Sequence, residues 1–229
     1  MKKLNLFTTT LIALLVFTAN IVFAQSAGPS DATSAAPTNP GDAGKIECYG
    51  SPISLSGPQD AGGVDYTKYH WYKIDASGTA QLVTAMTGRT YTEASGAKGY
   101  YNYQVVTENA NGCTSPISDV FKIYVLPQLT VAITTPASSI CAVASSATLL
   151  TANPTFAAAY PLSYQWTRNG VVIPGATSAT YNVTGETSAA TVTFGVTVSF
   201  SVLGTSCSTT STQDIIVTPL PTKPLITAN

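Results

Sequence analysis

Two groups of one tryptophan and two cysteines recur along this chain at a nearly constant spacing. The first group is Cys48, Trp71 and Cys113, and the second is Cys141, Trp166 and Cys207. Matching members lie about 94 residues apart, and Leu126-Pro127 recurs as Leu220-Pro221 at the same distance. A repeat at one fixed period predicts one structural unit used twice. We assign residues 44–127 to unit 1 and residues 128–221 to unit 2.

The first 24 residues have the pattern of a secretory signal peptide. Lys2 and Lys3 precede an apolar stretch at 11–24, and a signal peptidase is expected to cut between Ala24 and Gln25. The apolar stretch is about 14 residues long, shorter than the ~20 that a membrane-spanning helix needs. We therefore expect a secreted or cell-surface chain, exported by a bacterial route, whose mature part does not insert into a membrane.

Sparse charge and a single histidine argue against several classes of function. Only 9% of the residues are charged and the net charge is −1, so no basic surface for nucleic acid is expected. His70 has no nucleophile motif to serve, which argues against an enzyme, and no cofactor is implied. The acidic residues are scattered, without the spacing of a calcium loop, and the cysteines lack the close pairs of a zinc site. Neither a catalytic nor a metal site is predicted.

Short runs rich in Val, Ile, Thr and Tyr, separated by Gly, Pro, Asn and Ser, predict an all-β fold. In unit 1 the expected strands B, C, C′, E, F and G span 52–56, 69–74, 81–86, 89–93, 100–107 and 119–125. In unit 2 the expected strands A, B, C, C′, E, F and G span 129–134, 147–152, 162–168, 171–173, 180–183, 191–202 and 214–218. Asn169-Gly170 between C and C′ is a strong signal for a two-residue hairpin.

Two segments lie outside the two units, and composition and the repeat indicate what they are. Residues 25–43 form a Ser/Ala/Pro/Gly/Thr tract, which predicts a flexible spacer. Residues 222–229 hold the place in the repeat that 128–135 holds in unit 2, where strand A begins. They are either a short tail or the first strand of a further unit, and we expect further units downstream.

Alternation along strand C places Trp71 and Trp166 in the cores of their units. In an exported protein an even number of cysteines predicts disulfides, and the repeat favours one bridge in each unit, Cys48–Cys113 and Cys141–Cys207. On the expectation that strands B and F run antiparallel, the start of B and the end of F meet at one end of the sandwich. Each disulfide would then link these two strands at one end of the sandwich.

A tryptophan on strand C near a disulfide resembles immunoglobulin-type sandwiches. Residues 103–116 and 164–181 resemble the Ig-like repeats of large bacterial surface and secreted proteins. The resemblance covers residues 44–221 and implies two tandem antiparallel β-sandwiches. It implies a spacer, an adhesive module or an accessory binding module, without choosing among them.

Unit 1 holds most of the tyrosines. Tyr69, Tyr101 and Tyr103 have the alternation of core residues. An aromatic and polar face is predicted from residues with loop or outward positions, namely Tyr66, His70, Tyr72, Tyr100 and Asn102. Such a face suits a glycan or protein partner, although ordinary cross-strand pairing of aromatic rings on a sheet of low charge is the favoured explanation. Two functions follow: a non-catalytic structural or adhesive stalk segment, or a binding module that uses this face. The oligomeric state stays open.

Overall fold

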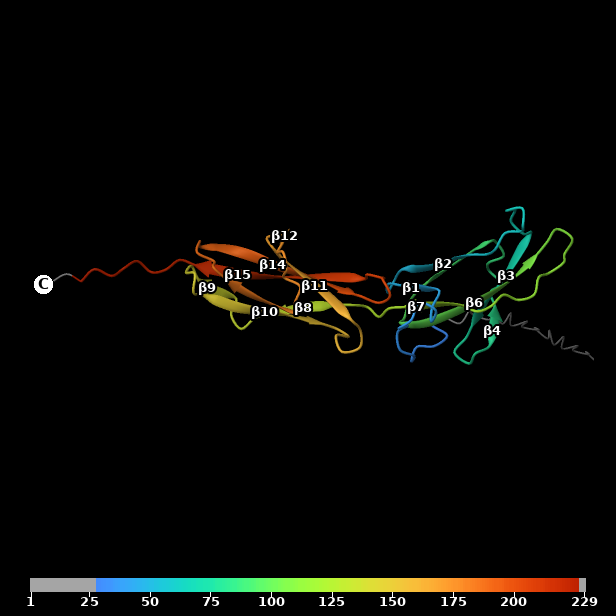
Figure 1. Ribbon diagram of the computed structural model, residues 1–229, viewed down its shortest axis with the longest axis horizontal. Helices are drawn as coiled ribbons and strands as arrows, with labels where there is room; N and C mark the ends of the chain where they lie inside the picture. Colours follow the sequence, from blue (N-terminus) through green and yellow to red (C-terminus); the bar gives the residue numbers. More distant parts are fainter. Residues whose placement is uncertain (1–27, 227–229) are drawn as a thin grey trace, which may run out of the picture.

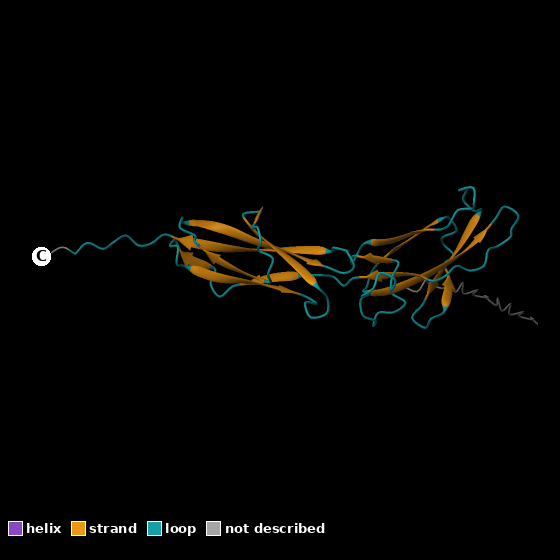
Figure 2. Cartoon of the chain, viewed as in Figure 1, coloured by secondary structure: helices purple, strands orange, loops and turns teal. Residues whose placement is uncertain are grey.

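The computed structural model of this chain describes residues 28–226, so the predicted signal peptide, residues 1–24, and its cleavage site lie outside the described residues. This part of the chain consists of strands and loops without a helix (Figure 2). The strands form two groups that lie end to end along the long axis (Figure 1). The prediction of an all-β chain with two Ig-like sandwiches is confirmed.

Unit 1 has a five-stranded sheet and a two-stranded sheet. The larger sheet has the order β1 (Lys45–Glu47), β7 (Phe121–Val125), β6 (Gly99–Glu108), β3 (Lys68–Ile74) and β4 (Ala80–Leu82). The smaller sheet pairs β2 (Pro52–Ser56) with β5 (Thr90–Ala94). β1 runs parallel to β7, and the other pairs are antiparallel. β1 was not predicted, and among residues 28–226 no strand A pairs with the second edge of β2.

Unit 2 is the more complete sandwich. Its five-stranded sheet has the order β12 (Val171–Val172), β11 (Leu162–Arg168), β14 (Ala190–Phe200), β15 (Ser208–Thr218) and β9 (Ser139–Cys141). Its three-stranded sheet has the order β13 (Thr180–Thr184), β10 (Ala147–Pro154) and β8 (Val131–Thr134). β8 is the predicted strand A, paired antiparallel with β10. β9 was not predicted and runs parallel to β15.

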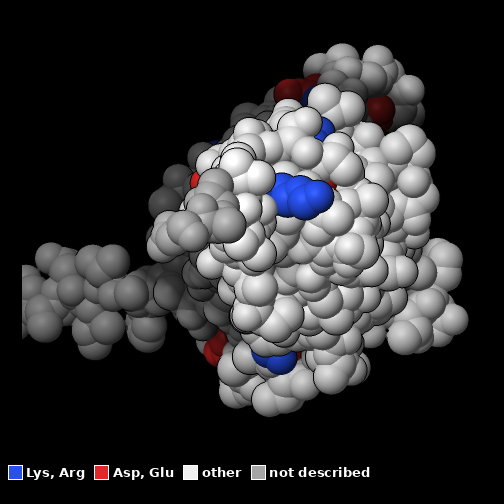
Figure 3. Space-filling model, turned by 90° about the vertical axis from the view of Figure 1, so that its left-hand side faces the viewer, with Lys and Arg blue, Asp and Glu red and all other residues white. Residues whose placement is uncertain are grey.

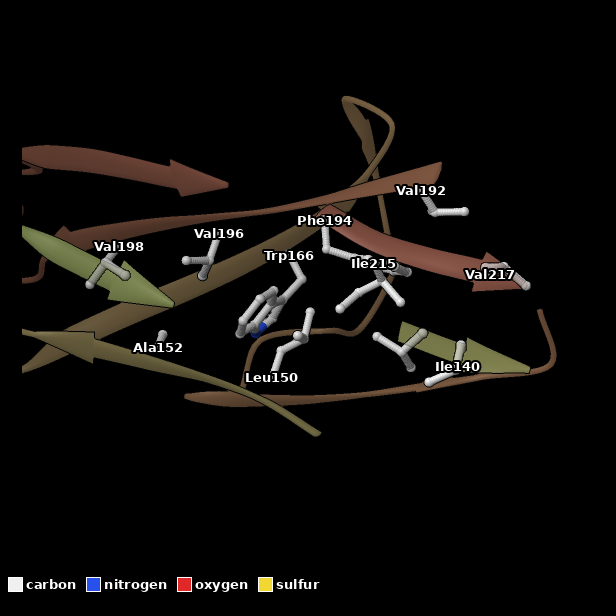
Figure 4. Packing of buried hydrophobic residues seen from close by; sticks show 11 residues of the cluster. Ile140, Leu150, Ala152, Trp166, Val192, Phe194, Val196, Val198, Ile215 and Val217 are labelled. Carbon is white, nitrogen blue, oxygen red and sulfur yellow. The ribbon is translucent and has the colours of Figure 1, made fainter. Parts of the chain in front are cut away.

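Both tryptophans lie in the cores of their units. Trp71 is 4% exposed and Trp166 is fully buried. Each indole N–H donates to a backbone carbonyl: Trp71 to Gly88 at 2.9 Å and Trp166 to Ser178 at 2.8 Å. Around Trp166 the side chains from both sheets are apolar, as Figure 4 shows. The indole therefore fills the space between the sheets while its one polar atom is satisfied.

A two-residue turn joins β11 to β12, as the sequence predicted. Asn169 and Gly170 both have positive φ, 47° and 78°. This backbone twist matches the twist of the two strands, and Asn-Gly tolerates it better than other pairs do.

Residues 28–43 are packed against unit 1, so the prediction of a flexible spacer is corrected for this part of the tract. Ser30 is buried, and its hydroxyl donates to the carbonyl of Ile74. Asp31 pairs with Tyr100 through two backbone hydrogen bonds of 3.2 and 2.8 Å. Pairing between β3 and β6 ends at Ile74 and Asn102, and Asp31 takes the next place beside β6, opposite Tyr100. Local composition does not encode this pairing between segments that are far apart in the chain.

Candidate functional site

The joint between the units is a buried apolar contact. Tyr124 of β7 and Leu126 after it are fully buried. The Tyr124 and Tyr160 hydroxyls share a hydrogen bond of 2.8 Å in this contact. The cluster comprises Ala43, Tyr124, Leu126, Tyr160, Phe200, Val202 and Cys207, drawn from both units. Burial raises the pKa of Tyr124, and the hydrogen bond to Tyr160 raises it further, so the Tyr124 phenol stays neutral at physiological pH.

A disulfide crosses this joint. Cys48 of unit 1 is bonded to Cys207 of unit 2, with a Cα–Cα distance of 5.6 Å and a sequence separation of 159. Cys113 and Cys141 are free and exposed. The predicted pairs Cys48–Cys113 and Cys141–Cys207 are therefore wrong.

Strand direction explains the correction. β1 runs parallel to β7, and the Leu126 N–H donates to the Glu47 carbonyl at 2.9 Å, so Cys48 lies at the end of unit 1 that meets unit 2. β6 runs antiparallel to β7 and ends at the opposite end of unit 1, where Cys113 follows. Strands B and F thus run in the same direction rather than antiparallel. We call the two ends at the joint the inner ends and the other two the outer ends.

The structure does not gather the five predicted binding residues into one site. Tyr66 is half-buried at the edge of the unit 1 core, with its ring centroid 6.2 Å from that of Tyr69. His70 lies on the outer face of β3, its Nε2 3.0 Å from an oxygen of Glu108. Tyr72 is half-buried on the same face, opposite Gln104 of β6.

Tyr100 and Asn102 do come together, in a polar pocket of about 330 Å³ beside residues 31–42. The pocket is lined by Asp31, Ser34, Ala35, Asp42, Tyr100, Asn102 and Lys122. The side-chain oxygen Oδ1 of Asn102 is buried and has no hydrogen-bond partner in the part of the chain that the structure describes. An unpaired buried acceptor costs free energy, which a donor on a bound molecule would recover.

Two carboxylates of this pocket are held ionised. Hydrogen bonds from Ser34 and Thr33 keep the pKa of Asp31 well below its usual range. Backbone N–H groups of Asn39 and Thr38 lower the pKa of Asp42. Neither residue was predicted, because residues 25–43 have the composition of a flexible spacer. The Asp-x-Thr-Ser spacing at Asp31, which favours an Asx turn, was the available signal.

Two other features, metal-ligand groups and membrane-spanning helices, are not found among residues 28–226. No group of three or more His, Cys, Asp or Glu side chains is placed to hold a metal ion there. Within the same residues, no helix is long and apolar enough to cross a membrane.

No protein-family model matches the chain, and no curated protein matches it significantly. Several solved structures are similar in fold. The fibronectin(III)-like modules of CbhA from Clostridium thermocellum are 18% identical, with a TM-score of 0.42 over 82% of this chain and 96% of that one. The amphioxus IgVJ-C2 molecule is 16% identical, with a TM-score of 0.34 over 75% of this chain and 99% of that one. The chicken CNTN1 FN1-FN3 domains are 14% identical, with a TM-score of 0.38 over 81% and 70%.

Proposed function

We propose that this chain is a non-catalytic stalk segment of a secreted or cell-surface protein, in which two Ig-like units form one stiff rod. The observation that carries the proposal is the joint, where a disulfide, a buried apolar cluster and a Tyr–Tyr hydrogen bond act together. Only residues 126–130 connect β7 to β8. A flexible linker would let the distance between the ends shrink, whereas a packed joint holds it.

Small-angle X-ray scattering of the chain tests the stiffness. We expect one elongated particle whose maximum dimension is the same under oxidising and mildly reducing conditions, because the apolar cluster holds the joint without the disulfide. Adding Leu126→Asp to the Cys48→Ser/Cys207→Ser variant should allow the rod to bend. Leu149→Asp is the matched control, an exposed leucine remote from the joint cluster. Scattering that shows a bent ensemble for the unmodified, oxidised chain would contradict the proposal.

A second candidate is recognition of a glycan or a protein by the pocket at Tyr100 and Asn102. The unpaired Asn102 oxygen supports it, because a sugar hydroxyl or a peptide N–H is a suitable donor. Asn102→Ala should abolish retention on a glycan array without lowering the melting temperature, whereas Tyr72→Phe should leave retention unchanged. Absence of any retention for the unmodified chain would reject glycan binding.

A further inference from the structure

Unit 1 leaves part of its core without a full cover. Leu55 of β2 and Val105 of β6 pack against the core of unit 1, but both are only half-buried. The registers place Leu150 and Val196 at the same positions in unit 2, where they are 0% and 1% exposed. Covering apolar side chains is favourable in proportion to the area removed from water. A segment that covered Leu55 and Val105 would therefore gain binding free energy.

An apolar groove of about 450 Å³ opens at these side chains, between the two sheets of unit 1. Trp71, Tyr103 and Phe121 also line it. Phe121 has the same alternation as the buried Ile123 of β7, yet it is 44% exposed. In unit 2, apolar side chains of β8 pack against the core. The size of the groove lies in the range of ligand-binding pockets, roughly 300–1,000 Å³.

The groove lies along an unpaired edge of β2. Among residues 28–226, β2 pairs with β5 alone, whereas β10 in unit 2 pairs with β13 on one side and β8 on the other. The Gly57 N–H donates to the Arg89 carbonyl at 2.8 Å, on the side of β5. Alternation therefore directs the backbone groups of Ser54 and Ser56 to the opposite edge, and both serines line the groove. One more strand would satisfy these groups.

The part of unit 1 that holds the repeat position of β8 cannot serve as this strand. Residues 37–40 correspond to 131–134 at the spacing of the repeat, and their sequence is Pro-Thr-Asn-Pro. Proline has no N–H for a sheet, and none of the four residues has a large apolar side chain. The N–H groups of Thr38 and Asn39 bond the carboxylate of Asp42 instead, beside the Tyr100 pocket. The groove is therefore open to a segment from another protein.

Charge at one end of the groove favours one direction for such a segment. Charged side chains are rare on this protein, and Figure 3, which views it from the outer end of unit 2, shows few of them. Asp119 lines the groove and makes no ion pair within residues 28–226, whereas Lys45, also in the lining, pairs with Glu47 at 2.6 Å. Asp119 precedes β7, which runs toward the joint, so its carboxylate lies at the outer end. A cation is favoured there.

We propose that unit 1 binds an extended segment of a partner protein as an additional strand on β2. β2 runs from the joint toward the outer end of unit 1, so an antiparallel segment has its N-terminal end near Asp119 and carries a basic residue there. Its residues opposite Ser54 and Ser56 exchange backbone hydrogen bonds with β2 and turn their side chains outward, as the exposed serines do. Its residues opposite Leu55 turn apolar side chains into the groove.

A synthetic peptide with this chemistry tests the direction of the segment. The probe is Lys-Thr-Val-Thr-Val-Thr, acetylated and amidated so that its ends carry no charge. By isothermal titration calorimetry we expect saturable binding of one peptide per chain. The matched control, Thr-Val-Thr-Val-Thr-Lys, should bind several-fold more weakly, and Asp119→Asn should remove the difference. Failure of the chain to bind the probe would overturn the proposal, and so would equal binding of the two peptides.

N-methylation of the peptide tests the strand pairing. Methyl groups on the nitrogens of the last two threonines, which face β2, should lower the affinity several-fold because they remove hydrogen bonds to Ser54 and Ser56. The same change on the two valine nitrogens, which face away from β2, is the matched control and should be tolerated. Equal losses from the two modifications would reject pairing with β2.

Ser54→Pro tests the edge from the side of the protein. The Ser54 N–H faces away from β5, so its removal should abolish peptide binding and leave the melting temperature unchanged. Ser54→Thr is the control and should bind normally. Peptide binding by Ser54→Pro at full affinity would place the peptide elsewhere. Asn102→Ala should not change the affinity, because Asn102 does not line the groove, so the stalk and glycan proposals are tested separately.

Discussion

The two units share one fold but differ in what fills the space beside the tryptophan. In unit 1, Lys73 is 2% exposed, and its ammonium contacts both oxygens of Glu93 at 2.8 and 3.1 Å. The hydroxyls of Tyr91 and Tyr103 each donate to Glu93 at 2.6 Å. In unit 2, the registers place Val183 where Glu93 stands and Phe194 where Tyr103 stands.

This difference shows that one sandwich can be held together in two ways. Unit 2 relies on apolar packing, which loses stability in proportion to the volume removed. Unit 1 relies on a polar network in which every member must be paired, because a buried charge left alone costs several kcal/mol. At the position of Lys73, unit 2 has Arg168, which pairs with the buried Glu186 but whose own side chain is 45% exposed.

The tryptophans give the largest expected effect. Trp166→Ala should lower the free energy of unfolding of unit 2 by about 4–5 kcal/mol, because Trp166 is enclosed on all sides. Trp71→Ala should cost unit 1 less, about 3 kcal/mol, because Trp71 borders an open groove of about 450 Å³ between the sheets of unit 1 and water can enter the space left. Calorimetry of both variants measures the two values. A larger loss for Trp71→Ala would mean that the groove is closed.

Lys73→Ala should lower the free energy of unfolding of unit 1 by about 3–4 kcal/mol, since it leaves Glu93 buried beside two tyrosines without its cation. Arg168→Ala, its counterpart in unit 2, should cost no more than about 1 kcal/mol, because the arginine side chain is 45% exposed. Denaturant unfolding followed by circular dichroism compares them. If the two variants lost similar amounts of unfolding free energy, the buried network of unit 1 would stabilise its unit no more than the partly exposed ion pair stabilises unit 2.

Cys48→Ser should lower the stability of the oxidised chain by about 2–4 kcal/mol, because the bridge closes a long loop of the unfolded chain. Without it we expect two calorimetric transitions, with unit 1 melting first because its sandwich lacks strand A. Cys113→Ser is the control and should leave the melting profile unchanged. If unit 2 melted before unit 1, unit 1 would be the more stable unit, contrary to this prediction.

The smallest effect concerns Glu186. The bond from Arg168 lowers the pKa of Glu186 in the folded chain, so the pair stabilises unit 2 above the pKa of the unfolded carboxyl, about 4.3. This contribution is lost as the pH falls through the lower folded pKa. Glu186→Gln should therefore cost about 0.5–1 kcal/mol at pH 7 and almost nothing near pH 3. A cost that does not depend on pH would show that the carboxylate charge is irrelevant.

The sequence predicted features that depend on near neighbours in the chain. Alternation placed Trp71 and Trp166 correctly, and Asn169-Gly170 formed the expected turn. Prediction from the sequence failed where segments that are far apart in the chain meet in the fold. The direction of strand F relative to strand B decided the partner of Cys48. The pocket at Asn102 was missed because residues 28–43 pair with β6 through backbone contacts, which composition does not reveal.

Peptide mapping under non-reducing conditions tests the disulfide across the joint most directly. Monomeric, oxidised chain should be digested after its free thiols are blocked. We predict a linked peptide that contains Cys48 and Cys207, with Cys113 and Cys141 carrying the blocking group. Linked peptides that join Cys48 to Cys113 and Cys141 to Cys207 would contradict the account, because each unit would then be closed on itself and the joint would have no covalent staple.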